Sequence, residues 1–150
     1  MLGVKTFIKI VLVLVVCGIA GFYLLDNGSS NFLHFEPNVV HVQGLLELRK
    51  EYGPPNFGET PKEDVVIQVP ILKPNAPVNV RGDPKSDINR ASAEDVTEMQ
   101  VLMYAIPVST HQKYFGTCVS ITGTLFTGHT GHHHTDVLIT AQKITPAECK

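Results

Sequence analysis

Four histidines stand close together in the last third of the chain, in the stretch GHTGHHHTD. Neutral imidazoles are common ligands of Zn, Cu and Ni. In an extended segment His132 and His134 would point to the same side, and His129 could close on them across a turn. His129, His132 and His134 are therefore the candidate metal ligands.

A structural role competes with metal binding at this stretch. Polar side chains at hairpin tips commonly hydrogen-bond to the loop backbone, and Thr130, Thr135 and the imidazoles could do the same. The sequence has no second Cys, His, Asp or Glu motif at fixed spacing beside the histidines. We favour the structural role and expect no required cofactor, with Zn, Cu or Ni binding as the alternative.

Catalytic chemistry has little support in the sequence. Ser109, Ser120 and Cys118 are the available nucleophiles, but no motif places a base or an orienting acid beside any of them. The sequence also has no glycine-rich phosphate loop and no catalytic pair of carboxylates. We therefore expect that the protein is not an enzyme.

Cys118 and Cys149 are the cysteines that lie outside the apolar N-terminal segment. With Thr127 opposite Asp136 in a hairpin, the register can be followed down both strands. Cys118 then stands opposite Thr145, and a turn of the tail brings Cys149 beside it. An oxidising compartment would favour the bond, so we predict a Cys118–Cys149 disulfide, with two free thiols as the alternative.

A β-hairpin is needed to position the histidines, and the flanking sequence predicts one. Val119, Ile121 and Leu125 alternate with polar residues before the histidines, and Val137 and Ile139 do so after them. This period of two is typical of strands with one buried face. The histidines are therefore expected in the connecting loop.

Three further strands are expected before this hairpin, over residues 39–50, 64–72 and 96–106. The first strand and the first hairpin strand share the pattern V-x-[VI]-x-G-x-L, and a glycine inside a strand often marks a bend where a sheet curls into a barrel. The sequence Ser109-Thr110-His111-Gln112 resembles a capping box and predicts a short helix over residues 110–115. Three strands, a short helix and two strands is the order of the OB-fold. We predict a mainly β protein built on a small OB-like five-stranded barrel with one short helix.

The N-terminus carries an export or membrane signal. Two lysines precede an apolar run over residues 10–25, and residues 7–25 together approach the roughly 20 residues that span a bilayer. Gly18 and Ala20 have the spacing of a signal-peptidase site, which leaves cleavage as the alternative. We favour an uncleaved anchor with the lysines in the cytoplasm.

The domain organisation follows from this signal. Residues 1–25 form a transmembrane anchor or signal segment, residues 26–31 form a linker, and residues 32–150 form an exported OB-like β domain. The protein is expected at the inner membrane with its domain outside the cytoplasm, in the periplasm if the cell is Gram-negative. The membrane contact is expected through residues 7–25.

The overall charge bears on the class of partner. The net charge is -2, the pI is near 6.4, and the sequence has no cluster of Lys and Arg. Nucleic-acid-binding domains usually carry a basic patch. We therefore expect no nucleic-acid partner.

Three motifs connect the chain to a known family. They are G-x-L followed by the GPPNF of residues 53–57, the VTEMQVL of residues 96–102, and the GTLF and HTGHHHTDVL segments within residues 119–138. Through them, residues 39–144 resemble a bacterial domain of unknown function found in small exported proteins and lipoproteins. The resemblance implies export and one compact domain. It implies no activity, because the family has no assigned catalytic residues.

Small exported β domains without catalytic groups commonly bind another macromolecule. We therefore expect an envelope-anchored, non-enzymatic protein that binds and restrains a protein partner. An immunity protein against an antibacterial effector is the most concrete form of this hypothesis. The alternative is a metal-binding envelope protein that uses the histidine loop.

Overall fold

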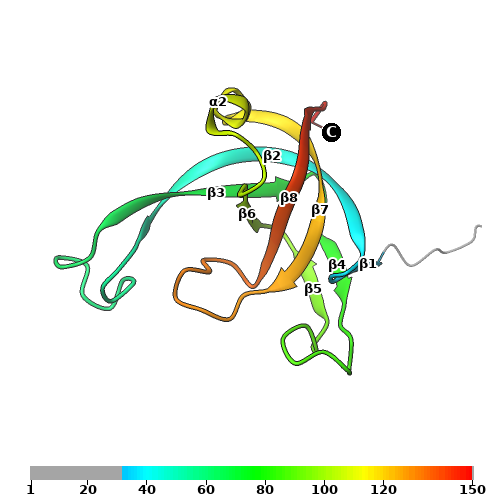
Figure 1. Cartoon of the computed structure of the whole chain (residues 1–150), viewed down its shortest axis with the longest axis horizontal. Coiled ribbons are helices and arrows are strands. Elements are labelled where there is room, and N and C mark those ends of the chain that lie inside the picture. Colours follow the sequence, from blue (N-terminus) through cyan, green and yellow to red (C-terminus); the bar gives the residue numbers. More distant parts are fainter. Residues whose placement is uncertain (1–31, 150) are drawn as a thin grey trace, which may run out of the picture. The chain divides into compact units, whose positions relative to one another are not determined.

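Five strands curve into a closed barrel, as Figure 1 shows for the computed structural model, which describes residues 32–149. The barrel strands neighbour one another in the order β2-β3-β6-β8-β7, and β7 closes the ring by pairing with β2. Their bounds are β2 (Val39–Tyr52), β3 (Val66–Pro74), β6 (Met99–Leu102), β7 (Thr117–Thr127) and β8 (Val137–Pro146).

The topology is that of an OB-like barrel. β6 and β8 pair in parallel, whereas the other neighbouring strands of the barrel are antiparallel. A short helix α2 (Val108–His111) and a 3-10 turn η1 (Gln112–Tyr114) lie between β6 and β7. The predicted mainly β fold, with its five-stranded barrel and one short helix, is confirmed.

A second, smaller sheet lies beside the barrel. It contains β1 (Phe32–His34), β4 (Val78–Arg81) and β5 (Ala93–Val96) in the order β1-β4-β5. The single strand predicted over residues 96–106 is therefore wrong, because it is divided between β5, β6 and a turn that ends at Ile106. Asp95 has a φ of 52°, in the left-handed region, so the chain changes direction before β6 begins.

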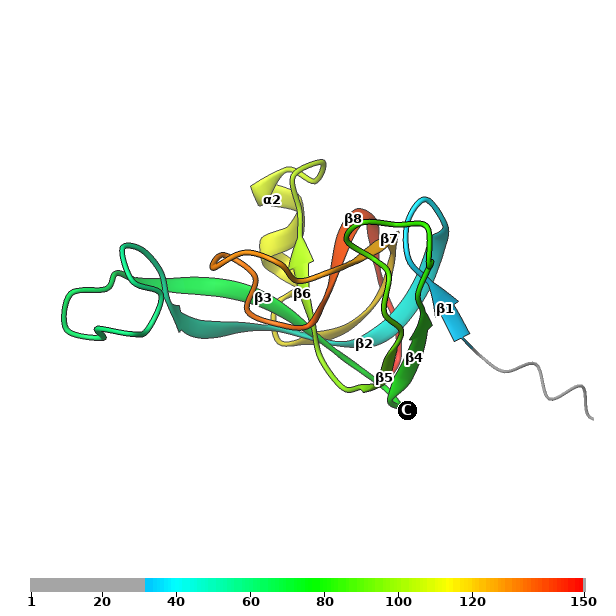
Figure 2. The same ribbon diagram turned by 90° about the horizontal axis from the view of Figure 1, so that it is seen from below.

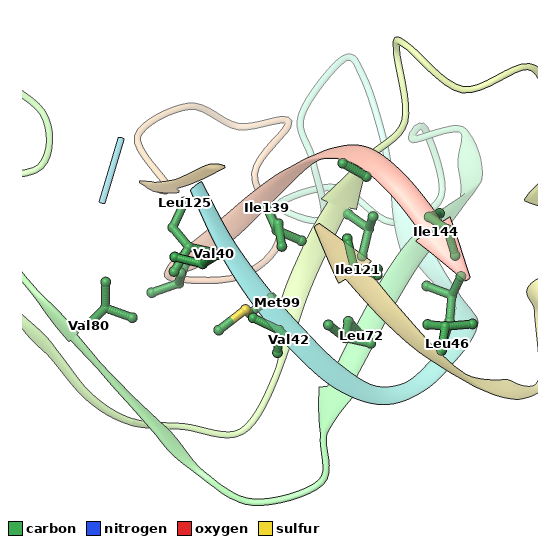
Figure 3. Packing of buried hydrophobic residues seen from close by; sticks show 14 of the residues in the cluster. Val40, Val42, Leu46, Leu72, Val80, Met99, Ile121, Leu125, Ile139 and Ile144 are labelled. Carbon is green, nitrogen blue, oxygen red and sulfur yellow. The ribbon is translucent and has the colours of Figure 1, made fainter. Parts of the chain in front are cut away.

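The core fills the inside of the barrel with alternating strand residues. Figure 3 shows Val42, Leu46, Leu72, Met99 and other labelled side chains gathered between the curved strands. These four side chains are buried, while Gln43 and Leu45, on the other face of β2, are more exposed. The predicted alternation on β2 and on the C-terminal hairpin thus produces the core.

The two glycines of the repeated strand pattern have a common structural cause. A Cβ atom on Gly44 would lie 2.0 Å from the Lys73 carbonyl oxygen, and one on Gly123 would lie 2.2 Å from the Thr140 carbonyl oxygen. Each glycine therefore sits where a neighbouring strand's backbone comes too close for any side chain. This is the close backbone approach that the sequence pattern predicts.

The C-terminal hairpin brings Cys118 and Cys149 together in a disulfide, with Cα atoms 5.4 Å apart. The predicted register is wrong by one residue near the tip, because Thr127 pairs with Val137. A bulge in the middle of the hairpin shifts it by one more residue. The Ala147 amide therefore donates to the Cys118 carbonyl, at 3.0 Å, and the tail passes beside β7.

The predicted anchor over residues 7–25 and the linker over residues 26–31 lie outside the described residues. Across residues 32–149, helices are too short to provide a membrane-spanning apolar segment.

Candidate functional site

β2 and β3 continue past the barrel as a two-stranded arm, formed by residues 48–52 and 66–70 and joined by the loop of residues 53–65 (Figure 1, Figure 2). β2 pairs with β7 only as far as Leu46, and β3 pairs with β6 only at Ile71 and Leu72. Within the arm the two strands therefore pair only with each other. This leaves two broad faces, each with its own set of side chains.

The loop at the tip of the arm is organised by one carboxylate. Asp64 accepts hydrogen bonds from the backbone amides of Asn56 and Gly58, both at 2.7 Å, and its side chain is nearly buried. Such a carboxylate satisfies amides that the turn leaves unpaired. The ring of Phe57, between these two residues, is thereby held toward the barrel's other long loop.

That other loop, residues 128–136 between β7 and β8, contains the four histidines and is called the histidine loop here. Its His132 ring meets the Phe57 ring edge-on, with centroids 4.8 Å apart. The histidine loop lies below β3 in Figure 1 and crosses in front of it in Figure 2, which is seen from below. The two long loops of the barrel are thus in contact.

The histidine loop covers one face of the arm and the neighbouring outer surface of the barrel. Arg49 and Val69 are register partners, so they project from the same face. Ile71, Gln100 and Leu138 form a row across β3, β6 and β8 on this surface. Val69, Ile71 and Leu138 are all buried although they point away from the barrel interior. We call this surface the covered face.

Gln100 is the residue that holds the histidine loop most directly. Its side-chain amide donates to the His132 carbonyl at 3.1 Å and accepts from the His134 amide at 2.7 Å. Its backbone amide donates to the Thr135 hydroxyl at 2.8 Å. Gln100 therefore supplies the hydrogen bonds that a neighbouring strand would supply. Sequence reasoning missed it, since a single Gln in a strand forms no motif.

Arg49 forms a second attachment. Its guanidinium donates to the His134 carbonyl at 3.2 Å and to a Glu98 carboxylate oxygen at 2.7 Å, and it also pairs with Glu51. Burial alone would lower the pKa of Arg49, but the hydrogen bonds to Glu98 and Glu51 outweigh it and raise that pKa. Arg49 thus stays charged and links the arm, the segment before β6 and the histidine loop.

The three candidate metal ligands have three different surroundings. The Nδ1 atom of His129 is 2.9 Å from the Thr127 carbonyl, His132 packs on Phe57, and the Nδ1 atom of His134 is 4.0 Å from Glu51. They do not converge as the extended-segment argument expected. Over residues 32–149, no three His, Cys, Asp or Glu side chains gather in a group that could hold a metal ion.

His133, which the metal hypothesis left out, is the partner of His129. The two rings meet edge-on with centroids 4.8 Å apart, and the His129 amide donates to the His133 Nδ1 atom at 3.0 Å. Burial, and then the charges of the three neighbouring histidines, lower the pKa of His133. An Nδ1 atom that accepts an amide hydrogen must be unprotonated, so the neutral ring carries its proton on Nε2.

The opposite face of the arm, called the open face here, carries apolar side chains in solvent. Leu48, Tyr52 and Val66 are 44%, 41% and 59% exposed, and Val65 at the tip is 57% exposed. These are four of the seven large hydrophobic residues exposed between residues 32 and 149, so the arm concentrates them. Pairing of Leu48 with Pro70, and of Tyr52 with Val66, places Leu48, Tyr52 and Val66 on one face.

A cleft of about 590 Å³ lies between residues 91–98 and the ends of the histidine loop. Its lining includes the carboxylates of Glu94, Asp95, Glu98 and Asp136 and no Lys or Arg. A lining of this charge disfavours anions. Two enclosed polar atoms of lining residues, Thr127 Oγ1 and the Nε2 atom of His134, have no hydrogen-bond partner within the described chain.

The barrel and its loops define an OB-like protein. The loop of residues 53–65 joins the barrel's first and second strands and the histidine loop joins its fourth and fifth, and these are the two loops beside which OB barrels bind ligands. Residues 98–145 match a family described as a domain of unknown function, DUF4431. No curated protein matches the chain, and no solved structure matches it. The predicted resemblance to an uncharacterised domain is confirmed over β6, α2, β7, the histidine loop and most of β8, while residues 39–97 lie outside the match.

Proposed function

We propose that this chain is an exported, membrane-anchored, non-enzymatic protein that binds and restrains a protein partner through the open face of the arm. The observation that carries the proposal is the exposure of Leu48, Tyr52 and Val66 on one face of a projecting hairpin. Clustered apolar side chains in solvent commonly mark interaction sites, and aromatic residues among them commonly contribute most to binding.

Export and anchoring are supported by two features of the chain. The apolar run over residues 7–25 has the composition of an anchor or signal segment. The Cys118–Cys149 disulfide suits an oxidising compartment outside the cytoplasm. Both features support the proposal that the arm meets an exported partner outside the cytoplasm.

An immunity protein against an antibacterial effector is the concrete form of this proposal. A protein of this class needs to bind a toxin tightly and needs no chemistry of its own. The small size of the domain and the export signal support this form. In the alternative proposal the histidine loop binds Zn, Cu or Ni, and the adjacent rings of His129 and His133 are the contact that favours it.

Photo-crosslinking in the native host tests the partner-binding proposal. A benzophenone amino acid is placed at Tyr52 in the full-length protein, and in a matched variant at Tyr104, which is 85% exposed in the turn that follows β6. We expect one discrete protein adduct from position 52 and none from position 104. Adducts at position 104 alone, or at neither position, would contradict binding through the open face.

A second arm variant tests how much the apolar side chains of the open face contribute to partner binding. Leu48→Ser and Val66→Ser together should strongly reduce capture of the crosslinked partner, because they remove two of the three exposed large apolar side chains of the open face. Ile88→Ser is the matched control, since Ile88 is 47% exposed in the β4–β5 loop. It should capture the partner as well as the wild type does.

A further inference from the structure

Lys50 stands in the middle of the open face. It lies between Leu48 and Tyr52 on β2, and its register partner on β3 is Gln68. The remaining residues of this face are Val66 and Pro70, so the open face contains one cation and no carboxylate. The side chain of Lys50 is exposed.

The charges on the other face of the same hairpin are all paired. Glu47 forms an ion pair with Lys73 at 2.5 Å, and Arg49 pairs with Glu51 and Glu98. Lys50 forms no ion pair with any residue between 32 and 149. The unpaired cation and the exposed apolar residues therefore belong to the same face.

A partner that covers this face must compensate the charge of Lys50 at the centre of the face. Removing an ammonium group from water costs several kcal/mol unless an opposite charge or hydrogen-bond acceptors replace the water. The methylene groups of Lys50 can pack with its apolar neighbours, while Nζ must find an acceptor. The partner that binds the open face must therefore place an acceptor opposite Lys50.

We propose that the partner presents an apolar surface to Leu48, Tyr52 and Val66, and that an Asp or Glu carboxylate in this surface pairs with Lys50. This inference rests on the proposed function. A lipid surface is disfavoured as the occupant, because recognition of anionic headgroups typically takes a cluster of about four to eight basic residues, and this face has one.

A zero-length crosslink tests the pairing directly. A carbodiimide activates a carboxylate, the Lys50 Nζ attacks the activated carbonyl, and an amide forms as the urea leaves. The reaction is run on the full-length protein in native membranes, in parallel with the benzophenone variant at position 52. We expect Lys50 to be joined to an Asp or Glu of the same protein that the benzophenone captures. Lys50→Arg keeps the charge but cannot couple in this way, so it should retain the benzophenone adduct and lose the amide.

Charge reversal measures the energetic effect once the benzophenone adduct has identified the partner. Lys50→Glu should weaken binding of the purified partner by about thirtyfold or more, the loss expected when a charge pair in an interface is broken. Lys85→Glu, in the exposed β4–β5 loop, is the matched control and should change the affinity by less than about twofold.

The outcomes separate this inference from the proposed function. A benzophenone adduct with unchanged affinity in Lys50→Glu would overturn the carboxylate pairing and leave partner binding intact. Absence of the benzophenone adduct would overturn partner binding itself. An adduct between two copies of this chain would identify a homodimer and contradict both.

A lipid occupant is tested with the full-length protein reconstituted into vesicles of phosphatidylcholine with or without phosphatidylglycerol. An amine-reactive reagent should acylate Lys50 equally in both. Protection of Lys50 only in the anionic vesicles would overturn the proposal.

Discussion

Arg49 donates a hydrogen bond to the backbone carbonyl of His134, 85 positions later in the chain. The bond joins the projecting arm to the histidine loop and makes the two faces of the arm unequal. One face lies under the histidine loop and has its charges paired, while the other carries exposed apolar side chains around the unpaired Lys50. The histidine loop, which contains the candidate metal ligands, therefore also has a structural role in the arm.

Arg49→Met should loosen the histidine loop. The change removes one bond to the loop and leaves Glu51 and Glu98 without their cation, so we expect a loss of about 1 to 3 kcal/mol in the free energy of unfolding. Urea unfolding measures this loss, and hydrogen exchange should increase over residues 128–136. Lys73→Met breaks the exposed pair with Glu47 and should cost less than about 1 kcal/mol. Equal losses in both variants would contradict a special role for Arg49.

Gln100→Ala should have a comparable effect through different atoms. It leaves the His134 amide and the His132 carbonyl without their partners, at a cost of about 1 to 3 kcal/mol. Gln100→Glu keeps the acceptor for the His134 amide but loses the donor to the His132 carbonyl. Hydrogen exchange of the histidine loop in this variant should therefore be faster than in the wild type and slower than in Gln100→Ala. A fully protected His134 amide in Gln100→Ala would show that other contacts hold the loop.

The histidine loop should weaken as the pH falls. Burial and neighbouring histidines lower the pKa of His133, so the folded state favours the neutral ring more than the unfolded state does. Its contribution to stability is fully present above the unfolded pKa of about 6.5 and is lost as the pH falls toward the lower folded value. Unfolding measured between pH 7.5 and pH 5 should show this loss, and His133→Asn, which keeps an acceptor near the Nδ1 position, should reduce it. An unchanged pH profile in that variant would assign the loss to another group.

Metal binding is tested by replacing two of the three candidate ligands. His132→Asn with His134→Asn keeps hydrogen-bonding groups but supplies poor ligands for Zn and Cu. Competition calorimetry should find wild-type affinity no tighter than roughly micromolar, because the three candidates have separate surroundings and would have to reorganise. Nanomolar, stoichiometric binding by the wild type would establish the metal proposal in its place. Its loss in the double variant would assign it to His132 and His134, and its persistence would assign it to the adjacent His129 and His133.

Cys118→Ser with Cys149→Ser should lower the free energy of unfolding by about 3 to 4 kcal/mol, because the disulfide closes a segment with a sequence separation of 31. The expected readout is a lower urea midpoint with an unchanged native spectrum. Reduction of the wild type should produce the same shift. A midpoint that neither treatment changes would mean that the native protein carries free thiols.

The barrel was accessible from the sequence because its determinants are local. Alternation at Val40, Val42 and Leu46 marks the face that the barrel buries, and Gly44 and Gly123 mark the points of close backbone approach. Each of these signals depends on side-chain size and the period of a strand. No knowledge of distant contacts is needed to read them.

The arm and its covered face were not accessible in the same way. Alternation indicates which side of β3 is apolar, but it does not indicate where β6 stops pairing with β3. Nothing in the sequence therefore predicted the length of the arm. Val69 and Ile71 are buried by a loop more than fifty residues later in the chain. The roles of Arg49 and Gln100 depend on that same distant segment, and neither residue forms a motif by itself.

The covered face makes the lengths of two separate segments interdependent. The histidine loop has to be long enough to reach from the barrel to Phe57, because Val69 and Ile71 are sheltered beneath it. A related chain with a shorter histidine loop would therefore need a shorter arm, or polar residues in place of this valine and isoleucine. Insertions and deletions in the two segments should accordingly occur together among related chains, although the segments are far apart in the sequence.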